Sequence, residues 1–508
     1  MKNEREFAAN SLVATALVAA LMLGGGTLAA AQNDLATSGA HARYRQTTIS
    51  STPPTVTFNT LVTFNGTNGA NPGLSPIQGT DGNLYGGTAG GGEHAHGVLF
   101  KMTPSGTLTV LYNFCAESGC PDGVGGAPEV LGSDGNLYGS TGGGGASNDG
   151  TIFKFTKHDT LTTLHSFDRT DGFAIKHLVQ ASSGSLYGTA SNGGNLSECF
   201  GIGCGTVFKI TTAGTLTTLY DFCSKSGCDD GAVIYDALKQ GPDGDYYGTT
   251  WAGGAGNGGT IFKITPATRT LTTLYSFCVI NYPFCGDGSN PIALVLASDG
   301  NFYGTTAYGG AYGEGSVFKI DPISGMLVTI YSFCTQIACT DGATPRDGLV
   351  LGSDGNFYGP TYYGGLYNQG TIFQITPAGA VNTLHNFDGT DGRYPIQHLF
   401  QATNGIFYGV TDNDGSNGDG TIFSLDLNLG FCVETAPISG KAGTKVIILG
   451  NKLKGTTSVT FNGALAVFKV VSSTEITTTV PGDAITGLVQ VTTPGGTLTS
   501  NVNFLVTP

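Results

Sequence analysis

Two histidines stand at a recurring position that is otherwise filled mostly by small or apolar residues. Counting six residues back from a recurrent turn acid, or its equivalent, gives Ser75, Pro128, His177, Ala237, Ala293, Gly348 and His398. Packing between repeated units does not demand histidine there, and imidazoles bind ligands and transfer protons near neutral pH. His177 and His398 are therefore candidates for a ligand-binding or acid–base site. The alternative is a duplicated subtype of unit, because the same two units also share His165 and His385 in Leu-His-Ser/Asn-Phe-Asp.

Aromatic residues in glycine-rich segments form a second candidate site. They are Trp251, Tyr308, Tyr312, Tyr362, Tyr363 and Tyr367. Exposed aromatic faces are suited to stacking on the apolar faces of sugar rings. Packing between neighbouring loops is the alternative.

Acidic segments give only partial matches to a metal site. Asp412, Asp414 and Asp419 are spaced like the acids of a calcium loop, but Asn417 replaces its turn glycine and no glutamate follows at the twelfth place. His94 and His96 could share a metal, or lie in a solvated loop. Recurrent Asp-Gly pairs are turn residues or carboxylate rings, and their repetition favours turns. They contain Asp81, Asp122, Asp134, Asp171, Asp230, Asp243, Asp287, Asp299, Asp341, Asp354 and Asp391. No cofactor is predicted, with calcium kept as a hypothesis.

Ten of the 11 cysteines fall in five local pairs, and four of these pairs occupy one position of the repeat. In an exported protein this spacing predicts five disulfides. The expected pairs are Cys115–Cys120, Cys199–Cys204, Cys223–Cys228, Cys278–Cys285 and Cys334–Cys339. Cys432 is left without a partner.

Charge and the N-terminus indicate where the protein works. The net charge of −14, from 36 acids and 22 bases, disfavours nucleic acid and anionic membranes as partners. Residues 1–31 read as a signal peptide, with an apolar core too short to span a bilayer, and residues 32–55 as a polar spacer. We expect an exported protein, extracellular, at the cell surface or periplasmic, with no membrane span in the mature chain.

A repeated phrase predicts the fold. Its Tyr-Gly pair begins at Tyr85, Tyr138, Tyr187, Tyr247, Tyr303, Tyr358 and Tyr408, and each unit reads as four short strands. Four antiparallel strands per repeat of about 50 residues are typical of β-propeller blades. Residues Val56–Phe64 resemble the strand that comes fourth in each unit, but they precede the first unit, and no such strand follows the seventh. The sequence therefore predicts an all-β chain, with a seven-bladed propeller over residues 56–430 closed by its N-terminal strand.

The repeats resemble the GloVer tandem-repeat family of choice-of-anchor bacterial surface proteins. Matching text stands at Asp134–Gly139, Asp299–Thr306 and Gly259–Pro266, within a resemblance that covers about residues 56–427. The resemblance implies secretion or surface display and no assigned activity. Residues 431–508 resemble an IPT/TIG domain, an immunoglobulin-like β-sandwich, which implies a spacer or a binding appendage.

Three functions remain open from sequence, and no catalytic residue is assigned. The first is a non-enzymatic exported protein that binds polysaccharide or a surface protein through its loops. The second is a glycan hydrolase or lyase with a site in the propeller channel, although the chain has no G-x-S-x-G, H-E-x-x-H or P-loop motif. The third is a structural envelope or matrix protein. The oligomeric state is not predicted.

Overall fold

The computed structural model describes residues 55–280 and 285–507. The predicted signal peptide and nearly all of the predicted spacer lie outside this part. The regular secondary structure of the described residues is almost entirely β-strand, with three single-turn 3-10 helices, η2 (Cys199–Gly201), η3 (Ser226–Cys228) and η4 (Ile337–Cys339). Within these ranges no helix has the length and apolar character needed to cross a membrane.

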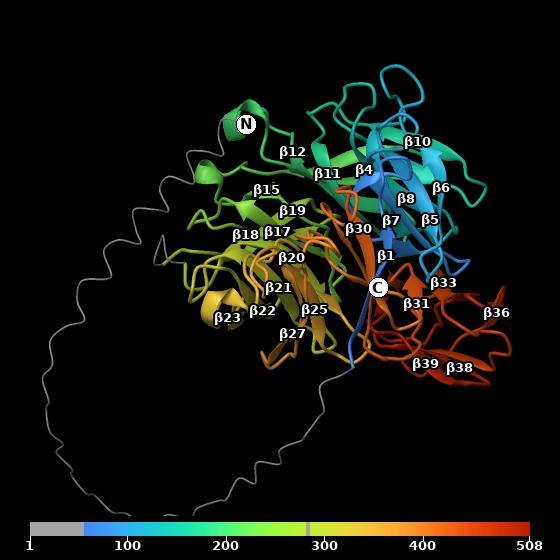
Figure 1. Cartoon of the computed structure of the whole chain (residues 1–508). Helices are drawn as coiled ribbons and strands as arrows, with labels where there is room; N and C mark the ends of the chain where they lie inside the picture. Colours follow the sequence, from blue (N-terminus) through green and yellow to red (C-terminus); the bar gives the residue numbers. More distant parts are fainter. Residues whose placement is uncertain (1–54, 281–284, 508) are drawn as a thin grey trace, which may run out of the picture. The chain divides into compact units, whose positions relative to one another are not determined.

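Seven antiparallel sheets occupy the repeat region, residues 57–426 (Figure 1). The first sheet contains β2 (Ala70–Pro72), β3 (Ile77–Gln78), β4 (Leu84–Gly90), β5 (Val98–Met102) and β6 (Leu108–Asn113). The second contains β7 (Val124–Leu131), β8 (Leu137–Gly143), β9 (Thr151–Phe155) and β10 (Leu161–Ser166). The third contains β11 (Phe173–Gln180), β12 (Leu186–Asn192), β13 (Thr206–Ile210) and β14 (Leu216–Asp221). The fourth contains β15 (Ala232–Ile234), β16 (Lys239–Gln240), β17 (Tyr246–Ala252), β18 (Thr260–Thr265) and β19 (Thr270–Ser276). The fifth contains β20 (Ser289–Leu296), β21 (Phe302–Tyr308), β22 (Ser316–Ile320) and β23 (Leu327–Ser332). The sixth contains β24 (Val350–Leu351), β25 (Phe357–Thr361), β26 (Thr371–Ile375) and β27 (Val381–Asn386).

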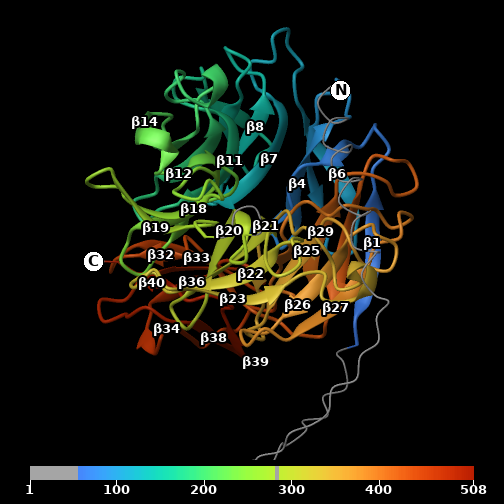
Figure 2. The ribbon, with the colours of Figure 1, turned by 90° about the vertical axis from the view of Figure 1, so that its left-hand side faces the viewer.

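The seventh sheet joins the two ends of the repeat region. It contains β28 (Phe400–Gln401), β29 (Phe407–Thr411), β30 (Thr421–Asp426) and the N-terminal strand β1 (Thr57–Thr63). β1 pairs antiparallel with β30, and the blue β1 lies beside the orange last sheet in Figures 1 and 2. One core cluster combines Val62, Phe64 and residues of the first sheet with residues of the last. The predicted pairing of the N-terminal strand with the last unit is therefore confirmed.

The repeated motif has a packing explanation. The glycine of each Tyr-Gly pair faces a phenylalanine of the next strand, as Gly139 faces Phe153, and an added Cβ would lie 2.7 Å from the Phe153 Cζ atom. The seven glycine–phenylalanine pairs are Gly86/Phe100, Gly139/Phe153, Gly188/Phe208, Gly248/Phe262, Gly304/Phe318, Gly359/Phe373 and Gly409/Phe423. The ring fills the space that a side chain would take, so each sheet needs both residues together.

All five predicted disulfides are present. Four lie in the segments after β6, β14, β19 and β23, and Cys199–Cys204 lies between β12 and β13. Cys432 is unpaired and buried, and burial raises the pKa of its thiol to about 12. Disulfides at this density are typical of proteins that fold in an oxidising compartment.

The C-terminal domain consists of short strands in three further sheets. One contains β31 (Glu434–Ala436), β33 (Lys445–Leu449), β37 (Glu475–Thr479) and β36 (Phe468–Val470); one contains β35 (Ala464–Leu465), β34 (Ser458–Phe461), β38 (Val489–Thr493) and β39 (Gly496–Thr499); and one pairs β32 (Ser439–Gly440) with β40 (Leu505–Val506). Ile448, Phe461, Val491 and Phe504 share one buried cluster between the first two sheets. Apolar and polar residues alternate along β34 and β38, which buries one face of their sheet, whereas β33 is buried on both faces, because Ile447 and Leu449 belong to a second apolar cluster.

Candidate functional site

Segments at or near the first strand of each repeat line one cavity, called the central cavity below. Its volume is about 220 Å³, and residues of all seven repeats line it. This volume lies below the roughly 300–1,000 Å³ of sites for drug-sized ligands, so the cavity suits one small ring or functional group. The charged, histidine and tyrosine residues in its wall are Glu129, Lys176, His177, Tyr235, Asp236, Arg346 and Asp347.

The two predicted histidines lie next to each other at the centre of the repeat region. The ring centroids of His177 and His398 are 5.2 Å apart. Each ring has its own carboxylate: His177 Nε2 lies 3.5 Å from Asp236 Oδ1, and His398 Nδ1 lies 3.4 Å from Asp347 Oδ1. The two histidines are far apart in the sequence, and the convergence of the sheets brings them together.

The surroundings push the pKa values of the two rings in opposite directions. Burial lowers the pKa of His177 to about 4, and Asp236 opposes this only in part. Burial also acts against a charge on His398, but the Asp347 carboxylate outweighs it and raises the pKa of His398. His177 is therefore neutral near pH 7, while His398 is the member that holds a proton more readily.

Sequence reasoning missed three charged residues that lie beside the histidines: Glu129, Asp236 and Lys239. Their signal was present in the repeat. The residue after the recurrent position reads Pro76, Glu129, Leu178, Leu238, Leu294, Leu349 and Leu399, so Glu129 replaces a leucine. Lys239, two residues after the recurrent position, likewise replaces an apolar residue. Asp236 and Asp347 stand directly before the recurrent position in their units.

Glu129 joins two neighbouring sheets. Its carboxylate accepts hydrogen bonds from the backbone N–H and hydroxyl of Ser140, and from the backbone N–H of Leu178 at 2.6 Å. Burial nevertheless raises the pKa of Glu129 to about 7, because these bonds compensate only part of the lost hydration. The carboxyl thus titrates near neutral pH at a position that is leucine in most of the other repeats.

We expect Glu129 to make stability depend on pH. Its pKa is higher in the folded chain than in the unfolded chain, so folding favours the protonated form, and stability falls as pH rises from about 4.5 to about 7. Glu129→Gln keeps an acceptor oxygen and cannot ionise. Denaturant titrations at several pH values measure the free energy of unfolding. Relative to the wild-type chain, that of the variant should rise by roughly 2–3 kcal/mol across this pH range. Glu117→Gln, in an exposed loop, is the control, and a flat difference for Glu129→Gln would contradict the expectation.

Two cations without a charged partner lie in the cavity wall. Among the described residues, neither Lys176 nor Arg346 makes an ion pair or a side-chain hydrogen bond. Each lies over an aromatic ring instead: Lys176 Nζ is 4.9 Å from the Tyr235 ring centroid, and Arg346 Cζ is 4.4 Å from that of Tyr362. Arg393, another cation near this position in sequence, is paired with Asp414 at 2.8 Å.

Most of the predicted aromatic residues gather in two clusters beside these cations. Trp251 stacks on Tyr235 at 4.6 Å and contacts Tyr308 edge-on. Tyr362 stacks on Tyr394 at 4.7 Å and contacts Tyr363 edge-on. Tyr235 and Tyr394 were not predicted. Tyr312 and Tyr367 are more than half exposed and have no aromatic partner among the described residues.

The recurrent aspartates have a structural role in their turns. Those before the second strands accept a hydrogen bond from the tyrosine four residues on, as Asp134 accepts one from Tyr138 at 2.8 Å. Those before the first strands accept one from the preceding strand, either from a tyrosine, as in Tyr112 to Asp122, or at a histidine, as in His165 with Asp171. His165 and His385 thus replace a tyrosine in an anchoring contact away from the cavity.

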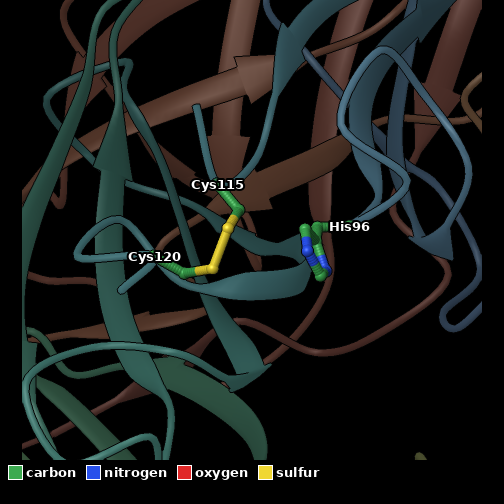
Figure 3. A group of neighbouring side chains, drawn as sticks. All are labelled: His96, Cys115 and Cys120. Carbon is green, nitrogen blue, oxygen red and sulfur yellow. A yellow bond between two sulfur atoms is a disulfide. The ribbon is translucent and has the colours of Figure 1, made fainter. Parts of the chain in front are cut away.

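The calcium hypothesis is not tested by these contacts. Asp414 pairs with Arg393, and within the described ranges Asp412, Asp414 and Asp419 are not among the groups of three ligands that lie within 4.8 Å. One such group does contain a predicted candidate, His96, with Cys115 and Cys120 (Figure 3). Both sulfurs are joined in a disulfide there, so neither is a thiolate ligand.

Comparisons with known proteins identify two regions. A model of the Gloeobacter/Verrucomicrobia repeat matches residues 26–233 and 279–462, and a model of the IPT/TIG domain matches residues 433–506. No curated protein matches the chain.

Similar solved structures are distant. TolB from Acinetobacter baumannii is 12% identical with a TM-score of 0.36, over 61% of this chain and 62% of that chain. The extracellular domain of the putative hybrid two-component system BT3049 from B. thetaiotaomicron is 11% identical with a TM-score of 0.46, over 87% and 52%. A fungal alcohol oxidase in complex with copper is 14% identical with a TM-score of 0.45, over 89% and 99%. The chain thus spans less than two thirds of the first two proteins.

Proposed function

The chain belongs to the Gloeobacter/Verrucomicrobia repeat family and contains an IPT/TIG domain, and we propose that it is an exported, non-enzymatic protein that binds polysaccharide at the central cavity. Five disulfides support export. The loops around the cavity provide the binding surface, and the C-terminal domain acts as a spacer.

In the proposed architecture the seven sheets are the blades of a seven-bladed β-propeller. The packing of the last sheet against the first and the entry of β1 into the last sheet support this arrangement. The two larger C-terminal sheets form an immunoglobulin-like sandwich around their shared apolar cluster. The proposed domain limits are residues 56–430 and 431–508.

The observation that carries the proposal is the pair of aromatic clusters beside the central cavity. Tyr235 lies in the cavity wall, and Tyr362 lies against the wall residue Arg346. Exposure remains substantial: 42% for Tyr235, 39% for Tyr308 and 38% for Tyr363. Partly exposed rings around a polar cavity offer both contacts that a sugar requires, an apolar face and hydrogen-bonding groups.

Binding to a panel of soluble and insoluble polysaccharides, with released sugar measured in the same samples, tests the proposal. We expect saturable binding without release. Trp251→Ala and Tyr362→Ala should each weaken it roughly tenfold or more, since aromatic residues dominate such contacts. Phe431→Ala, which removes an exposed aromatic residue outside the cavity, is the control. Binding that survives both cavity variants contradicts the proposed site.

The histidine pair favours a second candidate, catalysis on the bound glycan. One ring with a lowered pKa and one with a raised pKa, 5.2 Å apart, fit a base and an acid. Sugar release with a pH-dependent rate, lost in His177→Gln, would replace the non-enzymatic proposal. If neither polysaccharide binding nor sugar release is detected, the structural role is the function that remains.

A further inference from the structure

Two cations, Lys176 and Arg346, lie in the wall of the central cavity together with three carboxyl groups, those of Glu129, Asp236 and Asp347. The whole chain has a net charge of −14. The carboxylates have other partners: Asp236 and Asp347 lie against His177 and His398, and Glu129 accepts hydrogen bonds from Ser140 and from the backbone N–H of Leu178. Lys176 and Arg346 therefore face the cavity without an acidic partner of their own among the described residues.

The aromatic clusters hold both cations in place without neutralising them. Tyr235 supports Lys176 and is itself stacked on Trp251. In the same way Tyr362 supports Arg346 and is stacked on Tyr394. A cation over an aromatic face keeps its charge and its N–H donors, so both groups are oriented before a ligand arrives.

The burial of Lys176 also favours an anionic ligand at this position. Burial lowers the pKa of Lys176, although Asp236 and Asp347 oppose the shift. A partly buried ammonium without a partner is costly, and an incoming anion would relieve that cost.

We propose that the sugar bound at this cavity carries a carboxylate, as uronic acid residues do, and that Lys176 and Arg346 bind that group. The inference rests on the proposed function. A guanidinium matches a carboxylate with two parallel N–H···O bonds, and the ammonium adds a point charge. The neighbouring rings contact the apolar face of the same sugar. The ligand is thus an acidic polysaccharide, although the net charge of the whole chain is negative.

Two polymers with the same backbone test the proposal directly. Polygalacturonate and its fully methyl-esterified form share one backbone and differ at the carboxyl group, which is a charged carboxylate in the acid and a neutral methyl ester in the other. We expect the intact chain to bind the acid form at least about tenfold more tightly, with a preference that shrinks as salt is added. Lys176→Gln and Arg346→Gln should each reduce this preference to within roughly threefold, with the melting temperature unchanged.

Lys319→Gln is the matched control, because Lys319 also lies over a tyrosine ring, Tyr303, but is paired with Asp299 at 2.8 Å. It should leave the preference intact. Equal binding of the acid and the ester overturns the inference and leaves the proposed function standing. A preference for a sulfated polymer over polygalacturonate overturns the choice of carboxylate. If no polysaccharide of either charge binds, both the inference and the proposed function fail.

Discussion

A chain that begins at Asn65, and so lacks β1, is expected to fail to fold as a stable monomer. β1 and the residue after it contribute Val62 and Phe64, which are 8% and 0% exposed, to the core between the last and first sheets. Phe58 stacks on His385 at 3.6 Å and on Phe423 at 5.2 Å. Each large buried side chain is worth roughly 1.5–3 kcal/mol, so the loss approaches the roughly 5–15 kcal/mol that stabilises a typical domain.

Removal of β1 also opens an edge. β30 would present the unpaired backbone groups that now pair with residues 57–63, and an exposed edge promotes aggregation. A chain that begins at Thr55 is the control and should unfold like the full chain. A peptide of residues 55–65 should restore a soluble monomer to the truncated chain, whereas the same peptide with Val62→Asp and Phe64→Asp should not. A soluble, cooperatively folded truncated monomer without peptide would contradict the closure of the sheets by β1.

Gly139→Ala is expected to destabilise the chain by at least about 3 kcal/mol. The added Cβ would fall against the carbonyl oxygen of Ala127 and 2.7 Å from Phe153 Cζ, and a backbone atom cannot move aside as a side chain can. Gly142→Ala, on the same strand, is the control, because the nearest atom to its added Cβ is 4.0 Å away. Denaturant midpoints of the two variants measure the difference, and equal midpoints would show that the packing of phenylalanine on glycine is not the reason for the repeated Tyr-Gly pair.

The local structure was predictable because the repeat states it seven times. Turn aspartates, tyrosines and the Gly-Thr-Ile-Phe text mark the short strands of each unit, and the structure forms a sheet of four or five strands from each of them. The disulfides were predictable for a similar reason, since short loops leave each cysteine one near neighbour. His177 and His398 could be selected because they break the pattern.

The side-chain contacts within the cavity could not be predicted from the sequence. Lys176 lies over Tyr235, which belongs to the next repeat, and Arg346 lies over Tyr362. Such contacts depend on how far each first strand reaches toward the centre, and periodicity does not encode that distance. Arg393 illustrates the difficulty, because it stands near the same repeat position but pairs with Asp414. Glu129 was within reach, since it replaces a leucine of the repeat.

Hydrogen exchange of the full chain with and without polygalacturonate tests the central claim most directly, because it locates the bound ligand. If the ligand binds at the central cavity, protection will appear in residues 173–180, 232–240 and 343–351, which line it or directly flank it. Residues 434–506 of the C-terminal domain should exchange at an unchanged rate. Protection confined to the C-terminal domain, or binding with no protection in the three cavity segments, would contradict the account.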